Sequence, residues 1–410
     1  MRPKILFVCH RFPFPPKRGG KIRPFNIIRH LQQRADVTVA SVVRSEEEEA
    51  EATGIREHCS RFLVARVSPL AANLRMIAKL PGPEPSSMGY FYSPELARRI
   101  NETVAREHFQ LVFVHCSSAA QYVENLTAVP KVMDFGDMDS EKWFTYAAHR
   151  PFPASAGYWL EATKLRRAEV RLARQFDLST CTTRAELDTL KSLQAAVHTD
   201  WFPNGVDNEF FSPSSDPYDH DMICFTGRMD YFPNQQAADW LARDIFPRVH
   251  RLRPSARLML VGAAPPRRVQ RLGELPGVTV TGTVEDVRPY VLQSAVSVAP
   301  LRIARGTQNK ILEASAMGVP VITTPVAAQG VDMRPGQDLL VADNAEEFAV
   351  RILELMEQPD RRMEFSVAAR RRMLSHHSWQ ASMERLDDIL GHRFPDLFGH
   401  TLQRQEQRVG

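Results

Sequence analysis

The sequence predicts an α/β protein made of two Rossmann-like, doubly wound domains that face each other across a cleft. Three observations lead to this prediction. Short runs rich in β-branched residues alternate with helical stretches along the chain. Most of these runs are apolar at successive positions, as are strands of a parallel sheet that helices cover on both faces. A segment rich in Pro, Asn and Ser separates two similar halves of the 410 residues.

The first half alternates predicted strands with helical patterns, for example at residues 24–34 and 160–174. The strands are expected at residues 4–10, 36–43, 61–67, 110–116, 131–135 and 177–183. Because each is short and most are apolar on both faces, this half is expected to form a parallel sheet buried between helices.

The second half repeats the pattern, which fades near residue 385. Its strands are expected at residues 222–227, 256–262, 278–282, 295–300, 320–325 and 339–343. The predicted organisation is an N-terminal domain (1–202), a linker (203–220), a C-terminal domain (221–385) and a polar tail (386–410). Ligands of such folds bind beyond the carboxyl ends of the strands, so the site is expected in the cleft between the domains.

Composition narrows the class of protein. The formal net charge of +4 is too small an excess for a typical nucleic-acid-binding protein. Five widely spaced cysteines predict free thiols in a reducing compartment, and the absence of a signal-peptide pattern adds to the expectation of a cytoplasmic protein. Basic side chains along residues 160–174 are compatible with a helix that lies on anionic lipid at the cytoplasmic side of a membrane, but a solvated helix face is the more frequent case. They are Lys164, Arg167, Arg171 and Arg174.

The strongest local signal lies at residues 305–325, "RGTQNKILEASAMGVPVITTP". Gly306 and Thr307 are expected to begin a helix whose free N–H groups can bind an anion. Lys310 follows one turn later, and Glu313 lies on the same face, where its carboxylate can accept hydrogen bonds from a diol. The alternative is a Lys–Glu pair on a solvated surface.

A second signal follows the first strand of the second half. Gly227 ends this strand in "FTGRMDYFPN", and Arg228 stands at the carboxyl end of the sheet. A guanidinium group there suits a diphosphate, because its fork can bind two oxygens at once. The alternative is a surface arginine in a strand-to-helix loop.

In the first half, the loop after the first strand is rich in glycine and basic residues. Gly19 and Gly20 come just before a helix expected to begin near Lys21 or Pro24, and they permit a close approach of the backbone to a ligand. The basic residues, which suit an anionic acceptor, are Arg11, Lys17, Arg18, Lys21 and Arg23. A solvated loop is the alternative. The pattern is not GxGxxG, so no nicotinamide or flavin cofactor is predicted.

Polar residues also follow the fourth and fifth strands. His115 ends "LVFVHC", where it is expected to face the cleft, or else to be a satisfied structural histidine. Asp134, Asp137 and Asp139 follow in "VMDFGDMDS", either as ligands of sugar hydroxyls or as turn and capping carboxylates. No His or Cys partners complete a metal site, so no metal is predicted.

Several of these stretches together are similar to a known family. "FTGRMDYFPN" and "RGTQNKILEASAMGVPVITT" resemble the nucleotide-sugar domain of family 4 retaining glycosyltransferases, which have the GT-B fold. "FPNGVDNEFFSP" is similar to their interdomain linker. "RIARGTQNKILEASAMG" and "MDFGDMDSEKW" resemble the sugar transferases of bacterial exopolysaccharide clusters linked to PEP-CTERM/exosortase systems.

The resemblance implies a nucleotide-diphosphate sugar in the second domain and an acceptor in the first. Arg228 matches the diphosphate-binding arginine, Glu313 the ribose-binding glutamate and His115 the histidine near the transferred sugar. Two positions depart from the family. Arg305 stands where the first glutamate of the E-x7-E motif is expected, and Asn234 stands in place of a lysine whose charge Lys310 is expected to supply.

The implied site comprises three groups of residues. The catalytic group is His115, Arg228 and Lys310. The donor-binding group is Gly227, Arg228, Arg305, Gly306, Thr307, Gln308, Asn309, Lys310 and Glu313. The acceptor-side group is Gly19, Gly20, Lys21, Arg23, Asp134 and Asp137.

The resemblance implies a retaining, metal-independent glycosyltransferase that needs no cofactor. It would move a sugar to a saccharide acceptor, expected to be lipid-linked, in bacterial exopolysaccharide biosynthesis, with no nucleic-acid partner and with peripheral contact at the inner membrane. Two alternatives stay open. A nucleotide-sugar epimerase on the same fold would need acid and base carboxylates in the first domain, and a non-catalytic relative would fit the departures at Arg305 and Asn234.

Overall fold

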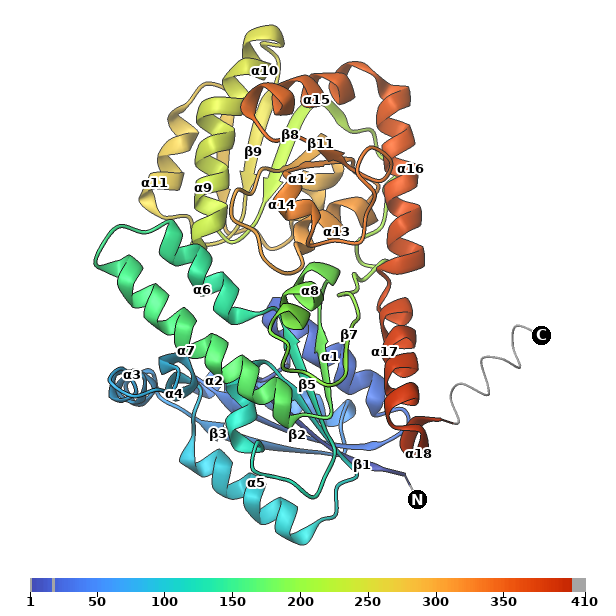
Figure 1. Ribbon diagram of the computed structural model, residues 1–410. Helices are drawn as coiled ribbons and strands as arrows, with labels where there is room; N and C mark the ends of the chain where they lie inside the picture. The colour runs from blue at the N-terminus through green and yellow to red at the C-terminus, as the bar shows by residue number, and fades with distance from the viewer. Residues whose placement is uncertain (1, 17–18, 400–410) are drawn as a thin grey trace, which may run out of the picture. The chain divides into compact units, whose positions relative to one another are not determined.

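The computed structural model describes residues 2–16 and 19–399. The chain divides into two compact units (Figure 1). Unit 1 comprises the chain up to Phe202 and the segment from Met383 onward, and unit 2 comprises Pro203–Ser382. Each unit contains one parallel sheet with helices, which confirms the predicted α/β fold class with two Rossmann-like domains.

The sheet of unit 1 has seven strands. In spatial order they are β3 (Arg61–Arg66), β2 (Asp36–Val43), β1 (Lys4–Cys9), β4 (Leu111–His115), β5 (Lys131–Gly136), β6 (Leu178–Cys181) and β7 (Thr199–Trp201). All neighbours are parallel, and Cys9 pairs with His115 while His115 pairs with Asp134. This register places the ends of β1, β4 and β5 side by side at one edge. All six strands predicted in this half are confirmed, whereas the short β7 was not predicted.

The helices of unit 1 connect these strands. They are α1 (Gly19–Leu31), α2 (Glu46–Glu51), α3 (Pro69–Ala78), α4 (Ser86–Tyr90), α5 (Pro94–Arg106), α6 (Asp139–Ala148), α7 (Ala154–Gln175) and α8 (Arg184–Ser192). Ser-Pro pairs begin two of them, because Ser68 and Ser93 each accept a hydrogen bond from a backbone N–H in the first turn of α3 and α5. Helix α1 begins at Gly19, so the two glycines form its first turn instead of preceding it as expected.

The sheet of unit 2 has six strands. In spatial order they are β10 (Val278–Gly282), β9 (Arg257–Val261), β8 (Asp219–Thr226), β11 (Ser294–Ala299), β12 (Val321–Thr323) and β13 (Leu340–Val341). The helices are α9 (Phe232–Trp240), α10 (Phe246–Leu252), α11 (Arg267–Gln270), α12 (Arg288–Leu292), α13 (Asn309–Ala316), α14 (Pro325–Ala328), α15 (Ala345–Glu357) and α16 (Pro359–His376). All six strands predicted in this half are confirmed.

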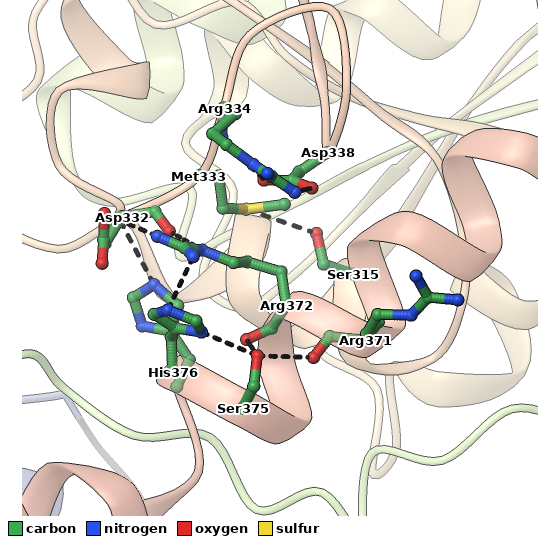
Figure 2. A network of polar contacts seen from close by, with 10 residues as sticks. Ser315, Asp332, Met333, Arg334, Asp338, Arg371, Arg372, Ser375 and His376 are labelled. Carbon is green, nitrogen blue, oxygen red and sulfur yellow. Dashed lines mark hydrogen bonds and ion pairs between the residues drawn. The ribbon is translucent and has the colours of Figure 1, made fainter.

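A polar network joins α16 to the loop before β13 (Figure 2). Arg372 Nε donates a hydrogen bond to the backbone oxygen of Asp332 over 2.6 Å, and its Nη2 pairs with the Asp332 carboxylate at 2.9 Å. In the same loop Met333 accepts a hydrogen bond from Ser315 of α13. Arg370 of α16 donates to the backbone oxygen of Ala316 over 2.7 Å, where α13 ends and its carbonyl groups need donors. The network therefore holds α13, which carries Lys310 and Glu313.

The two ends of unit 2 meet each other. Val206 N donates a hydrogen bond to the backbone oxygen of His377 over 2.7 Å, and Ser382 Oγ donates to that of Pro203. The chain then returns to unit 1 within α17 (Trp379–Arg393), which α18 (Pro395–Phe398) follows.

Part of the expected polar tail is folded. We expected this tail from residue 386, but α17 runs on to Arg393 and buries Leu386 and Leu390. The apolar spacing of this helix was too short a pattern to recognise in the sequence. The rest of the expected tail, residues 400–410, lies outside the described residues.

Candidate functional site

The carboxyl end of β8 is built from glycines that bring two loops together. Gly262 has a φ of +153°, and a Cβ atom there would lie 1.7 Å from the backbone oxygen of Gly227. Only glycine permits this approach. Gly227 N in turn donates a hydrogen bond to the backbone oxygen of Val261 over 3.0 Å. The loop after β8 therefore lies against the end of β9 and leaves bare backbone at this edge of the sheet.

Lys310 lies against this bare backbone. Its Nζ atom donates a hydrogen bond to Asn234 Oδ1 over 2.6 Å, and Asn234 Nδ2 donates to the backbone oxygen of Arg228 over 2.8 Å. A Cβ atom on Gly227 would come within 3.1 Å of Nζ. The lysine is also the only one among residues 203–382. Asn234 thus holds the ammonium group of Lys310 beside Gly227.

Burial shifts the pKa values of Lys310 and Glu313. It lowers the pKa of Lys310 to about 7 and raises the pKa of Glu313 to about 7, and the charge of each residue partly counteracts the shift of the other. Asn234, the acceptor of the ammonium group, is neutral. An anion beside Nζ would therefore stabilise the charged form of Lys310, and the attraction between the two charges would strengthen the binding of the anion.

The loop before α13 carries the remaining predicted donor residues. Gly306 has a φ of +63°, and its backbone oxygen would lie 2.2 Å from a Cβ atom on Gly330, so this loop is also closely packed. Gln308 donates to the backbone oxygen of Arg305 over 3.1 Å. The helix begins at Asn309, later than we expected, because Gly306 and Thr307 form the loop that leads into it. The residue at its N-cap, Gln308, makes no side-chain capping hydrogen bond.

Arg228 is exposed and already paired. Its Nε and Nη2 atoms bind the two carboxylate oxygens of Asp230 at 3.1 and 2.6 Å, and this hydrogen bonding raises the pKa of the guanidinium group. Arg228 therefore has to release the Asp230 carboxylate before its guanidinium group can bind a diphosphate ligand. Such an exposed pair holds its partners weakly.

In unit 1 the strand ends form a buried network around Asp134. The Asp134 carboxylate accepts two hydrogen bonds from Arg23, each of 2.9 Å, one from His115 Nδ1 at 2.7 Å and one from Thr180 at 2.9 Å. Arg23 also donates to the backbone oxygen of Phe202 and lies 3.6 Å from the centre of its ring. This network fixes the orientation of the His115 ring.

The charges of this network follow from its geometry. Burial alone would raise the pKa of Asp134, but the Arg23 guanidinium and the His115 hydrogen bond hold it well below its usual range. A carboxylate can only accept hydrogen bonds, so Nδ1 of His115 carries the proton. The hydrogen bond at Nδ1 also fixes the position of Nε2 on the other side of the ring.

The acceptor-side residues are not equivalent. Arg23 and Asp134 are buried, so their expected contact with an acceptor does not fit the structure, and their geometry suits the positioning of His115. Lys21 is paired with Glu48 at 2.6 Å, and Asp137 accepts a hydrogen bond from Thr182. Gly19 and Gly20 are exposed in the first turn of α1. Lys17 and Arg18 of the expected basic loop lie outside the described residues.

The expected basic face of residues 160–174 is only partly present, because Arg167 and Arg174 are exposed but Lys164 and Arg171 are not free at the surface. Lys164 is buried and caps the end of α3, and Arg171 pairs with Glu84 and Glu124. The helix uses these two cations for internal contacts, because its partner elements supply backbone oxygens and carboxylates.

Sequence reasoning missed His10 and Arg44, which follow β1 and β2 at the same edge as His115. The rings of His10 and His115 lie 6.0 Å apart, and Arg44 lies 4.2 Å from the ring of Tyr90. Burial and the neighbouring cations lower the pKa of His10. A polar residue directly after an apolar strand was the available signal. Within the described residues, no group of three or more His, Cys, Asp or Glu side chains suits a metal ion, and no helix has the length and apolar character to cross a membrane.

Residues 220–358 match the family model described as glycosyl transferases group 1. No curated protein matches the chain. Solved structures similar to the chain include HepE of Anabaena in complex with UDP, at 16% identity and a TM-score of 0.68, over 95% of this chain and 100% of that one.

Two further solved structures are similar along their whole length. Sucrose-phosphate synthase from Thermosynechococcus elongatus shares 16% identity, with a TM-score of 0.69, over 97% of this chain and 100% of that one. A glycosyltransferase from Rickettsia africae shares 13% identity, with a TM-score of 0.62, over 96% of this chain and 98% of that one. These likenesses show the GT-B fold.

Proposed function

We propose that the protein is a retaining glycosyltransferase that takes a sugar from a nucleotide-diphosphate donor. The observation that carries the proposal is the ammonium group of Lys310, which a neutral amide holds beside the bare backbone of Gly227. The match of residues 220–358 to glycosyl transferases group 1 supports it. HepE, whose fold is similar, is solved in complex with UDP and with UDP-glucose.

In this proposal unit 2 binds the donor. Lys310, Arg228 and the N–H groups before and within the first turn of α13 stabilise the negative charge that grows on the leaving diphosphate. Glu313 accepts hydrogen bonds from the ribose, and Arg305 lies by the sugar. No metal and no cofactor takes part. His115, which Asp134 orients, lies near the transferred sugar, and retention follows when the donor phosphate itself helps to remove the acceptor proton.

The proposed acceptor is a lipid-linked saccharide of bacterial exopolysaccharide biosynthesis, bound by unit 1. Gly19, Gly20, Lys21 and Asp137 are the proposed contacts. The proposal includes a cytoplasmic location with peripheral contact at the inner membrane and no nucleic-acid partner. Membership of family 4 and the link to PEP-CTERM/exosortase clusters are part of the same proposal.

The first test is thermal stabilisation by UDP, GDP, ADP and CMP and their sugars, with EDTA present throughout. A ligand that binds the folded state raises the melting temperature. We expect one nucleotide diphosphate and its sugar to do so. Lys310→Met should weaken that nucleotide on the order of tenfold or more, the cost of one charged hydrogen bond, while Lys191→Met, at an exposed lysine of unit 1, should leave its affinity unchanged.

Lys310 offers a second, independent test. Because its pKa is lowered to about 7, a large share of its amine is uncharged and nucleophilic at pH 7, unlike that of an ordinary lysine. Acetic anhydride at pH 7 should therefore acylate Lys310 early, and the bound nucleotide should protect it in peptide mass spectra. Equal labelling with and without nucleotide would contradict the assignment. Nucleotide binding without sugar transfer would instead favour a non-catalytic relative.

A further inference from the structure

The exposed apolar side chains of unit 1 are concentrated on α3 and around the start of α7. Seven of its eight exposed large apolar residues among those the structure describes lie on α3, just after it, just before α7, or in the first two turns of α7. They are Leu70, Leu74, Ile77, Leu80, Phe152, Trp159 and Leu160, and we call this set the α3–α7 face. Clustered exposure of this kind marks an interaction surface, whereas single exposed apolar residues do not.

Helix α3 turns its apolar side outward. Leu70, Leu74 and Ile77 are spaced four and three residues apart, which places them on one side of a helix, and they are 71%, 59% and 55% exposed. The opposite side packs on α4, since a Cβ atom on Gly89 would lie 2.7 Å from the backbone oxygen of Arg75. A helix on the surface of a globular domain normally turns its leucines toward the core, so this outward side is a candidate contact surface.

Buried charges fix α3 and α4 on α7. Lys164 Nζ donates hydrogen bonds to the backbone oxygens of Lys79 and Leu80, at 3.1 and 2.7 Å, at the end of α3. The Glu161 carboxylate accepts hydrogen bonds from the backbone N–H groups of Ser86 and Ser87, at 2.9 and 2.8 Å, at the start of α4. These contacts therefore keep the end of α3 and the start of α4 beside α7.

Within the two segments that carry this face, the charged residues are all basic. Residues 67–83 carry Arg75 and Lys79 and no Asp or Glu, and residues 142–160 carry Lys142 and Arg150 and no Asp or Glu. Trp, Phe and Leu beside Lys and Arg are the composition of protein surfaces that lie in the headgroup region of anionic lipid bilayers.

We propose that the α3–α7 face docks the protein on an anionic lipid membrane. The face differs from the basic side of residues 160–174 that the sequence suggested, because Lys164 and Arg171 are used internally. This inference names a surface for the membrane contact of the proposed function. It rests on the geometry of unit 1, while nucleotide binding rests on unit 2, so the two can fail separately.

The test uses the full chain and sedimentation with vesicles. One set contains phosphatidylcholine alone, and the other contains phosphatidylcholine with phosphatidylglycerol. We expect binding to the anionic vesicles, weakened by salt because it depends on basic residues near the surface. The double variant Leu74→Ser, Ile77→Ser should bind anionic vesicles on the order of tenfold or more weakly, because the two apolar side chains of the wild type move from water into the bilayer on binding.

A matched control separates docking through the α3–α7 face from nonspecific adsorption to vesicles. Val350 and Val367 of unit 2 are 54% and 49% exposed, and their double change to serine should leave vesicle binding intact. All four residues are exposed, so both variants should fold, and both should keep the nucleotide-dependent rise in melting temperature.

Three results would overturn the inference. The first is no binding to anionic vesicles, and the second is an equal loss of vesicle affinity in the two double variants. The third is a wild-type dimer in analytical ultracentrifugation that the double variant Leu74→Ser, Ile77→Ser dissociates, because the face would then join two copies of the chain. Vesicle binding without any nucleotide effect would retain this inference and refute the proposed function.

Discussion

The change Asp134→Asn tests the buried network of unit 1. All four contacts of the carboxylate come from donors: Oδ2 accepts from Arg23 Nε and His115, and Oδ1 accepts from Arg23 Nη2 and Thr180. An asparagine has one acceptor oxygen and one NH2 group. In either orientation its NH2 group would face two donors, one of them on Arg23, and the guanidinium would lose its buried counter-charge.

The expected cost follows from these losses. Breaking a buried ion pair by removing one partner costs about 3–5 kcal/mol. For a unit of this size, about 2–4 °C of melting temperature accompany each kcal/mol, so the transition of unit 1 should fall by about 6–20 °C. Differential scanning calorimetry of the full chain measures this shift. Asp137→Asn is the matched control, because Asp137 bonds only to Thr182 among the described side chains and is partly exposed.

The pH dependence of the stability difference gives a second check on Asp134→Asn. The pKa of Asp134 is depressed in the folded protein, so its contribution is fully present above the ordinary carboxyl range and is lost as the pH falls through the lower folded value. The difference between wild type and Asp134→Asn should therefore shrink only below about pH 4. A loss no larger than that of Asp137→Asn, or a difference that is constant down to pH 3, would refute the reasoning.

Three further predictions concern single residues. Burial raises the pKa of Glu169 to about 8. Between the ordinary carboxyl pKa and pH 8, the folded state therefore holds a proton that the unfolded state has lost, so the free energy of unfolding falls as the pH rises. Glu169→Gln should reduce this pH dependence when urea unfolding is compared at pH 5 and pH 8. Gly227→Ala should weaken nucleotide binding on the order of tenfold in isothermal calorimetry, since its Cβ atom would press on Asn234 at 2.8 Å and Lys310 at 3.1 Å, and unchanged affinity would contradict the donor site. Gly262→Ala should lower the melting temperature markedly, because backbone lies 1.7 Å from the new atom, and a wild-type melting curve would show that this approach is not required.

The fold was predictable from the sequence because buried parallel strands have a strong local signature. Runs such as "KILFVC" are apolar at every position except the first, and each occurs as a strand. The strand β7 escaped notice, since Thr199–Trp201 is short and only Trp201 is buried. The start of α13 was placed too early because Gly306 and Thr307 suit a helix start and a loop equally well.

The site was less predictable because pairing depends on distant residues. The sequence places Lys310 and Asn234 76 positions apart, and nothing local indicates that the amide holds the ammonium group. Arg23 and Asp134 looked like ligand contacts, yet their 111-residue separation closes into a buried ion pair. Strand ends supply polar residues, but tertiary packing decides which of them stay open to a ligand.

The meeting of the two ends of unit 2 has a consequence for its independence. Residues 203–382 start and finish at one place, through Val206 with His377 and Pro203 with Ser382. Such a segment is, in effect, an insert with adjoining termini, the geometry that tolerates excision, transplantation and circular permutation. We therefore expect residues 203–382 to be exchangeable as a cassette between related chains. Under the proposed function, the exchange would transfer the choice of donor, and the surrounding chain would keep its own acceptor.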